Sequence, residues 1–344
     1  MHDGIVEGHI DDSGTWERVN SDRNRLVFLM GDPTSGPLVS LSDIDPGNPM
    51  NTPSRLRRLK LKALSLLPER AQQLLRAMFS HRRMHHHRTD TFRMQVKDDP
   101  GQCIIFGSKR YGFGDFRLQP GMIRYKEWSS HGGCLELEFC ADRRGEPPIE
   151  GDVWAIDDES VIRARSAGGA FVSQVNRFHT RDEDAMPGTL AYTAAASVPR
   201  TGITGSFDDD GWAVLSDGSK VAALFMGVPT TGPMVVLSHN VPGAVEAPAG
   251  TYPTEMLRLI LKGTCRVGDR SFGPGSWRVT DSNVRQGPVV HGPEGSMQLL
   301  FLADRRGWLP STASDSAIEL VPRMSEQASV LGRFVESAVL GRRP

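Results

Sequence analysis

The sequence lacks the features that mark several common protein classes. Its 344 residues carry a formal net charge of −1, so no overall field attracts nucleic acid or an anionic membrane. The first residues, MHDGIVEGHIDDSG, contain no basic segment followed by an apolar run, and no stretch has the length and apolarity of a membrane span. We therefore expect a cytoplasmic protein with no nucleic-acid partner and no membrane partner.

Cysteine is also scarce. The chain has four cysteines without any CxxC spacing, so the sequence indicates neither a zinc knuckle nor a disulfide framework. We expect free, mostly buried thiols at Cys103, Cys134, Cys140 and Cys265. Glycine and proline are abundant, with 36 and 23 residues, which suits many short strands joined by turns better than a helical bundle.

The chain contains one domain twice. Residues 8–47 align with residues 204–243 without a gap, and Trp16 and Gly31 fall on Trp212 and Gly227. Further matches join 89–97 with 254–262, 111–117 with 272–278, and the two ADRRG segments 141–145 and 303–307. The length allows two domains, each with its own core. The repeat predicts that these are two copies of one domain.

Short apolar or alternating runs within each copy predict β-strands. In the first copy these runs are 26–30, 37–41, 92–96 and 135–139, and Gly, Pro and Asp turns bound them. A tandem all-β domain of this size favours a closed barrel or a double-sheet roll. Because residues 8–20 and 204–216 are related, each copy should begin with the same outer strand.

A family resemblance adds detail to this architecture. It is carried by the step from Gly114 over five residues to Pro120, by the Pro-Gly pair of each repeat, and by an HxH sequence before a strand. In these features the chain resembles the bicupins, which have two small jelly-roll barrels in tandem. The resemblance implies an all-β protein with an N-terminal barrel over 1–150, a linker over 151–203 and a C-terminal barrel over 204–310.

Two segments outside the repeat predict helices. The first copy carries a basic insertion, residues 51–84, and from Pro68 its apolar residues recur on one helical face. We expect this insertion to pack on a barrel or on a partner subunit, or to form a lid over the barrel mouth. The tail, residues 311–344, is expected to form a helix from Ser325 and to dock on a barrel or at a dimer contact. A homodimer is therefore expected.

Metal-binding cupins are similar to one another in two motifs that supply three His and one Glu. In the first copy HxH is retained as His85 and His87, whereas Thr91 stands at the Glu position and Tyr125 at the third His position. Such ligands suit Fe, Mn, Ni, Cu or Zn and leave positions open for substrate. The resemblance thus implies one divalent metal ion in the N-terminal barrel, bound by His85 and His87.

The second copy has lost this ligand set. Gly250, Tyr252, Met256 and Gln286 stand at the four ligand positions, so we expect no metal ion in the C-terminal barrel. For the first copy there is also a simpler interpretation. The run from His85 to His87 follows the basic insertion directly and could be a solvated extension of it.

Three functions follow from these residues. The first is a metal-dependent oxygenase or lyase that acts on a small organic substrate, with Asp90, Tyr125 or His131 completing the site. The second is metal-free acid–base chemistry in the same pocket, as in an isomerase, epimerase or cyclase, where a His moves protons with Asp90 and Tyr125 as partners. The third is a non-catalytic bicupin that binds a small molecule or serves as a scaffold.

One pair of arginines occupies the same position in each copy. Arg93 and Arg258 align and could hold anionic ligands. We expect them instead to be structural and to bridge to Asp142 and Asp304 of the repeated ADRRG segments.

Overall fold

The computed structural model describes residues 4–20, 23–45, 85–87, 89–106, 109–119, 127–130, 132–146, 149–150, 203–206, 213–227 and 231–310. These residues form strands and three short 3₁₀ helices, η1 Ile10–Thr15, η2 Arg143–Gly145 and η3 Arg305–Gly307, so the predicted all-β class is confirmed. The predicted helices in 51–84 and 311–344, and almost all of the 151–203 linker, lie outside the described residues. Across the described ranges, no helix has the length and apolarity that a membrane span needs.

The first repeat contains the strands β2 Glu17–Asn20, β3 Arg23–Leu29, β4 Leu38–Ile44, β5 His85–His86, β6 Thr91–Gln95, β7 Ile104–Phe106, β8 Lys109–Tyr111, β9 Asp115–Gln119, β10 Glu127–Ser129, β11 Cys134–Cys140 and β12 Ile149–Glu150. The second contains β14 Ala213–Val214, β15 Lys220–Phe225, β16 Met234–Asn240, β17 Val245–Ala247, β18 Gly250–Thr251, β19 Met256–Val267, β20 Arg270–Phe272, β21 Ser276–Thr280, β22 Arg285–Gln286 and β23 Val289–Leu302. Two further strands, β1 Ile5–His9 and β13 Ile203–Ser206, open the repeats. The four strands predicted from apolar runs are confirmed as β3, β4, β6 and β11.

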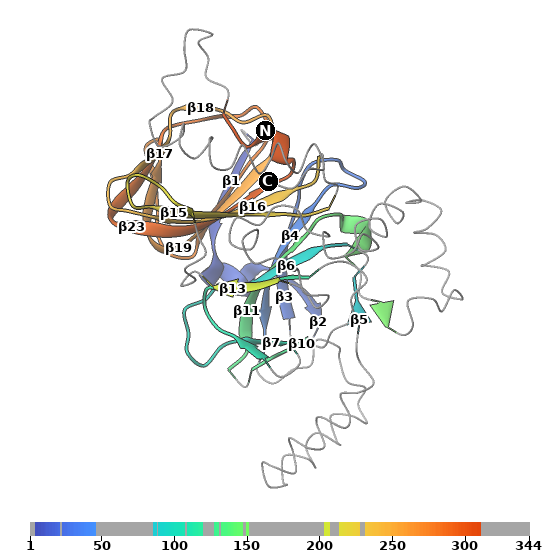
Figure 1. Ribbon diagram of the computed structural model, residues 1–344. Helices are drawn as coiled ribbons and strands as arrows, with labels where there is room; N and C mark the ends of the chain where they lie inside the picture. The colour runs from blue at the N-terminus through green and yellow to red at the C-terminus, as the bar shows by residue number, and fades with distance from the viewer. Residues whose placement is uncertain are drawn as a thin grey trace.

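The two large sheets have the same strand order. One sheet runs β13-β9-β6-β11-β4-β3-β2, and the other runs β1-β21-β19-β23-β16-β15-β14. Each strand has its aligned counterpart at the same place in the other sheet, which confirms the internal repeat. We call the first sheet with β5, β7, β8, β10 and β12 the N-terminal barrel, and the second sheet with β17, β18, β20 and β22 the C-terminal barrel (Figure 1).

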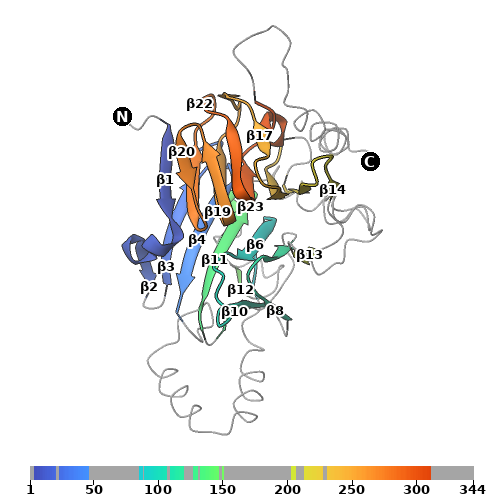
Figure 2. The same cartoon turned by 90° about the vertical axis from the view of Figure 1, so that its left-hand side faces the viewer.

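The outer strand that opens each repeat pairs with the barrel of the other repeat. β1 pairs antiparallel with β21, where Gly8 lies opposite Trp277, and β13 pairs with β9, where Gly205 lies opposite Phe116. Figures 1 and 2 show β1, in blue, beside the orange strands of the C-terminal barrel. Gly8 is required there, because a Cβ atom would overlap the Trp277 indole ring. The predicted outer strands exist, and the two repeats exchange them.

The main apolar core lies between the two large sheets. Successive side chains of a strand point to opposite faces. In β11, Leu137 and Phe139 therefore point into this core, whereas Glu136 and Glu138 point into the N-terminal barrel. Across the core, the rings of Phe139 and Phe301 meet edge to face at a centroid distance of 5.0 Å.

This shared core corrects the expectation of two separate cores. Buried apolar residues of both repeats form one continuous cluster, because each large sheet covers its apolar face with the other sheet. Among the described residues, each barrel adds a small apolar cluster of its own, around Phe106 and Tyr111 in the first and around Phe272 and Val289 in the second. All four cysteines are free and buried, as predicted.

The repeated ADRRG segment fastens the turn between β3 and β4 and the equivalent turn between β15 and β16. Its first arginine, Arg143, donates from Nε to the Gly36 carbonyl at 3.0 Å, and Arg305 donates to the Gly232 carbonyl at 2.9 Å. Arg305 is fully buried. These contacts explain why the segment recurs in both copies without a role in the barrel interiors.

Candidate functional site

Arg93 on β6 lies at the centre of the N-terminal barrel. Its Nη1 lies 2.8 Å from Glu127 Oε2, its Nε lies 3.2 Å from Glu136 Oε1, and its Nη2 donates to Glu138 Oε1 at 2.5 Å. A guanidinium presents five N–H groups in a rigid plane, so it can face several carboxylates at once. The side chains of all four residues are at most 4% exposed, so the cluster is shielded from bulk water.

Strand register brings these groups together. Glu138 lies directly opposite Arg93 in the ladder between β11 and β6, and Glu136 lies two residues away on the same face. Opposite residues in an antiparallel pair have Cβ atoms about 4.5–5.5 Å apart, so their side chains meet. Glu127 comes from the separate strand β10, which pairs with β7.

Burial and neighbouring charges move the pKa values of two of these acids in opposite directions. Desolvation raises the pKa of Glu127 well above its ordinary value against the pull of Arg93, and the negative charges of Glu136 and Glu138 raise it further. Desolvation also acts on Glu138, but the positive charges of Arg93 and Arg25 outweigh it and hold that pKa well below its ordinary value. Burial in this cluster therefore favours the protonated form of Glu127, whereas the neighbouring cations favour the carboxylate form of Glu138.

His87 joins this cluster in one tautomer. Its Nδ1 meets the backbone carbonyl of Glu146, which can only accept a hydrogen bond, so Nδ1 carries the proton. Its Nε2 lies 2.9 Å from Arg93 Nη2, which can only donate, so Nε2 is the acceptor. The imidazole is therefore neutral, and both of its nitrogens have partners.

The residues placed around His87 do not fit a metal ion. A ligand nitrogen must direct its lone pair at the cation, whereas His87 Nε2 receives an N–H of a guanidinium. Nowhere in the described chain do three or more His, Cys, Asp or Glu side chains gather as a metal-binding group. The backbone of His85 pairs with Glu150, but the His85 side chain lies outside the described part. Metal binding by His85 and His87 stays a prediction.

Asp90 binds the other repeat. Its Oδ2 accepts a hydrogen bond from the Gly227 N–H at 2.9 Å, and the aligned Glu255 accepts one from the Gly31 N–H. The two carboxylates thus make reciprocal contacts between the repeats. The catalytic role of Asp90 stays a prediction. The other two predicted catalytic residues, Tyr125 and His131, lie outside the described residues.

The predicted partners of Arg93 and Arg258 are wrong. Asp142 and Asp304 each pair with the second arginine of their own ADRRG segment, at 2.6 and 2.5 Å. Each aspartate caps a 3₁₀ helix and accepts the backbone N–H two residues on. Such local capping holds an Asp side chain near its own backbone.

Arg258 in the C-terminal barrel faces one carboxylate. Its Nη1 and Nη2 donate to the two oxygens of Glu246 at 3.0 Å each, and Nη1 also donates to Gln298 Oε1 at 2.6 Å. His291 Nε2 lies 3.2 Å from Glu246 Oε2. Burial raises the pKa of Glu246, but Arg258 and His291 outweigh it and hold that pKa well below its ordinary value.

Sequence reasoning missed the acids of both barrels. The alternation in CLELEFC gave a signal for Glu136 and Glu138, because it places two carboxylates on one face of a strand. Glu127 and Glu246 stand in short strands without a motif, and no such signal marks them.

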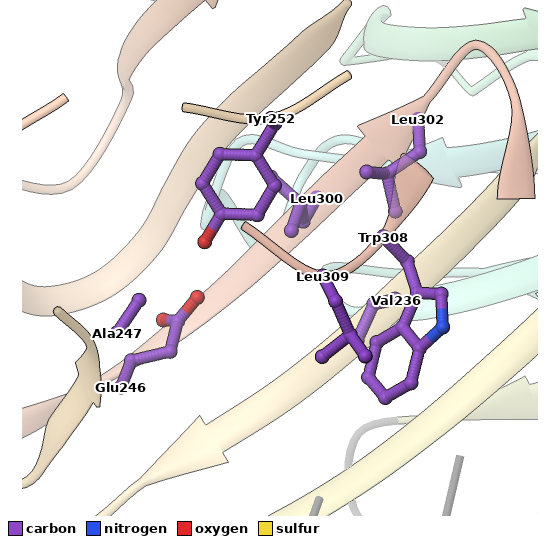
Figure 3. A pocket seen from close by; sticks show the side chains of 8 residues that line it. All are labelled: Val236, Glu246, Ala247, Tyr252, Leu300, Leu302, Trp308 and Leu309. Carbon is purple, nitrogen blue, oxygen red and sulfur yellow. The ribbon is translucent and has the colours of Figure 1, made fainter. Parts of the chain in front are cut away.

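The residues of the C-terminal barrel that align with the cupin metal ligands lie close together. Gly250 pairs with Gln286 between β18 and β22, and Gln286 Nε2 donates to Met256 Sδ at 3.2 Å. These positions carry an amide and a thioether where a metal site needs imidazole and carboxylate. Beside it lies a cavity lined by Val236, Glu246, Ala247, Tyr252, Leu300, Leu302, Trp308 and Leu309 (Figure 3).

Known proteins resemble this chain in structure and not in sequence. No family model matches it, and no curated protein matches it. A candidate dioxygenase from Nostoc punctiforme superposes with a TM-score of 0.50 and 11% identity over 91% of this chain and 89% of its own. The Ylba protein of E. coli gives 0.46 and 9% over 88% and 92%. Oxalate decarboxylase of Bacillus subtilis, an enzyme with Mn(II) centres, gives 0.43 and 14% over 87% and 77%.

At such identities the likeness concerns the fold alone. The structural likeness to the Nostoc punctiforme protein agrees with the strand order of the two sheets and with the internal repeat of this chain. The chain therefore has the tandem jelly-roll fold of the cupins.

Proposed function

We propose that the N-terminal barrel carries out metal-independent acid–base chemistry on a small polar organic substrate, as an isomerase, epimerase or cyclase does. The supporting observation is the cluster around Arg93, in which Glu127 and Glu138 lie 2.8 and 2.5 Å from one guanidinium beside a neutral His87. Proton transfer needs an acid and a base held together with separated pKa values. In this proposal Glu127 is the acid and His87 is the base.

Each residue has a role in this proposal. Glu127 supplies a proton, and His87 Nε2 accepts one, while Glu138 holds the Arg93 guanidinium in place. Arg93 positions the acids and stabilises negative charge that develops on a substrate oxygen. Exclusion of bulk water strengthens these interactions. Matching substrates carry a carbonyl group with an exchangeable C–H bond beside it.

A metal-dependent oxygenase or lyase is the second candidate. One observation favours it: Gly250, Met256 and Gln286 meet in the C-terminal barrel, which supports an equivalent place for His85 and His87 in the N-terminal barrel. The metal ion would be Fe, Mn, Ni, Cu or Zn. In this alternative His87 Nε2 has to leave Arg93 before it can bind a cation.

Hydrogen exchange in D₂O tests the first candidate. The full chain, purified without a His tag and treated with a chelator, is incubated with small oxo acids, hydroxy acids and sugars while ¹H NMR follows their C–H signals. We expect exchange to persist after chelation. It should fall about 100-fold or more in Glu127→Gln and His87→Gln, because general acid–base catalysis contributes about 10²–10⁴-fold. The exposed Glu294→Gln variant is the control.

Other outcomes point to the other functions. Exchange that stops after chelation and returns with one divalent ion would replace this proposal with the metal-dependent one. A His85→Ala/His87→Ala variant should then bind less metal. Without any exchange, stabilisation by a tested compound would indicate a binding module, and a lack of stabilisation would indicate a scaffold.

Assembly and location stay predictions. The expected homodimer is tested by light scattering on the full chain, and the expected cytoplasmic location by fractionation of cells that express it. The domain limits 1–150, 151–203, 204–310 and 311–344 are likewise predictions, and limited proteolysis would test them.

A further inference from the structure

The C-terminal barrel holds a cavity that the chemistry proposed for the N-terminal barrel does not use. Its walls are apolar where Val236, Leu300, Leu302 and the Trp308–Leu309 pair line it. Figure 3 shows the Tyr252 hydroxyl turned towards the same end as the Glu246 carboxylate. The cavity therefore has an apolar body and one polar end.

The polar end has unused hydrogen-bonding capacity. Glu246 Oε2 receives Arg258 Nη1 at 3.0 Å and Gln298 Nε2, and it lies 3.2 Å from His291 Nε2. From the described side chains, Glu246 Oε1 receives one N–H, from Arg258 Nη2 at 3.0 Å. A carboxylate oxygen can accept two hydrogen bonds, so Oε1 has room for another donor.

The Tyr252 hydroxyl is available as well. No group within the described ranges forms a hydrogen bond with it. Desolvation, helped by the charge of Glu246, raises the pKa of Tyr252, so the hydroxyl keeps its proton and can both donate and accept. A molecule at this end of the cavity would find one acceptor in Glu246 and one donor in Tyr252.

Charge at the polar end is already balanced. Arg258 meets Glu246 with two N–H groups, and the side chains of both residues are at most 10% exposed. A further cation would lose its hydration without gaining an unpaired anion, and burying such a charge is costly. The polar group that fits is therefore an uncharged donor.

The size of the cavity restricts the ligand and shows where it enters. The volume is about 20 Å³, room for about one water molecule, so a larger guest requires a wall to move. The walls on β16, β17 and β23 are held in strand ladders. Trp308 and Leu309 follow η3, are half-buried and belong to no strand. Displacing these two side chains opens the cavity without breaking a sheet.

We propose that the C-terminal barrel binds a compact, uncharged molecule with an apolar body and one hydroxyl group. The apolar body would lie against Leu300 and Leu302 under Trp308 and Leu309. The hydroxyl would donate to Glu246 Oε1 and accept from the Tyr252 hydroxyl. This site lies in the other barrel from the proposed acid–base cluster, so the two proposals stand or fall separately.

Phenol is the probe, and toluene is the control of similar shape without the hydroxyl. Calorimetric titration of the full chain should show phenol binding more tightly than toluene by about 12- to 160-fold, the effect of a hydrogen bond to a charged group. Tyr252→Phe should weaken phenol binding by about 2- to 12-fold, the effect of a neutral hydrogen bond, and leave toluene binding unchanged. Val236→Phe should fill the cavity and remove binding of both.

Thermal unfolding without a probe checks that each variant is folded, and Leu309→Phe is a second cavity-filling variant in case Val236→Phe fails to fold. Phenol binding that is unchanged in a folded cavity-filling variant would overturn the proposal. So would tighter binding of benzylammonium than of phenol, since it would show that the site prefers a cation. An absence of phenol binding at millimolar concentration would overturn it as well.

Discussion

The two barrels share a strand order and a central arginine, and they differ in what surrounds that arginine. Arg93 faces three buried acidic side chains in the N-terminal barrel, whereas Glu246 is the one described acid that Arg258 faces. By strand order and alignment, the counterparts of Glu136 and Glu138 are Gln298 and Leu300. One interior is a charged cluster, and the other is partly apolar.

This difference shows how few positions decide the chemistry of a barrel. Leu300, the counterpart of Glu138, is itself a wall of the cavity in the C-terminal barrel. The opposite face of the same strand keeps its apolar residues in both repeats, because that face is buried between the sheets. The interior face can therefore change while the shared core and the fold stay the same.

Removing the central arginine should give the largest difference in stability loss between the two barrels. Breaking a buried ion pair costs about 3–5 kcal/mol, because it leaves an uncompensated buried charge. Arg93→Met leaves the buried Glu138 carboxylate beside two further buried acids, so its loss of unfolding free energy should reach the upper end of that range. Arg258→Met leaves one acid and should lie near the lower end. Urea denaturation at neutral pH measures both.

The exposed Arg285→Met variant is the control and should change the free energy of unfolding by no more than about 0.5 kcal/mol. Equal losses in the two buried variants, or a larger loss for Arg258→Met, would contradict the difference between the barrels.

The second-largest difference should lie in how the acids of the two barrels change the stability of the protein with pH. Folded Glu127 keeps a proton that an unfolded Glu releases above about pH 4.3, so its contribution to stability falls as pH rises above that value. The pKa of Glu246 is lowered in the folded state, so its contribution is lost as pH falls below about 4.3. Each effect has a slope of at most about 1.4 kcal/mol per pH unit.

Glu127→Gln should therefore flatten the stability profile above about pH 4.3, and Glu246→Gln should flatten it below that value. Unfolding free energies from pH 3 to pH 8 measure the profiles, with Glu294→Gln as the exposed control. Two variants that flatten the same pH range would show that the acids do not differ in protonation.

The smallest effect concerns the reciprocal contacts between repeats. Asp90→Asn and Glu255→Gln keep an acceptor oxygen for the N–H groups of Gly227 and Gly31 but remove its charge. We expect each to lower the free energy of unfolding by about 1 kcal/mol, the size of an ordinary hydrogen bond. Asp90→Asn should leave deuterium exchange in the N-terminal barrel unchanged. Lost exchange with unchanged stability would instead give Asp90 a catalytic role.

Much of the fold could be predicted because each strand pattern in one repeat has an aligned counterpart in the other. Runs of alternating residues located β3, β4, β6 and β11, and the alignment gave each a counterpart. The same pattern could not predict what covers an apolar face. Alternation shows that Leu137 and Phe139 share a face, but only tertiary packing shows that this face meets Phe301 of the other repeat.

The site was harder to predict for a related reason. Arg93 and Arg258 were found because they align, but their partners lie far away in sequence. Glu138 is 45 residues from Arg93 and reaches it through the ladder between β6 and β11. Asp142 and Asp304 were the wrong partners because the cap of a 3₁₀ helix holds each in place.

Through β1 and β13, each half of the chain contributes one strand to the barrel of the other half. The His9 side chain hydrogen-bonds to the carbonyl of Pro274 at 2.7 Å, a contact between residues 265 positions apart. Losing the first nine residues would therefore uncover β21, a strand of the C-terminal barrel. An uncovered strand edge is a template for pairing with another chain. Because β1 is the last strand of that sheet, the N-terminal segment decides which strand of the C-terminal barrel presents the open edge.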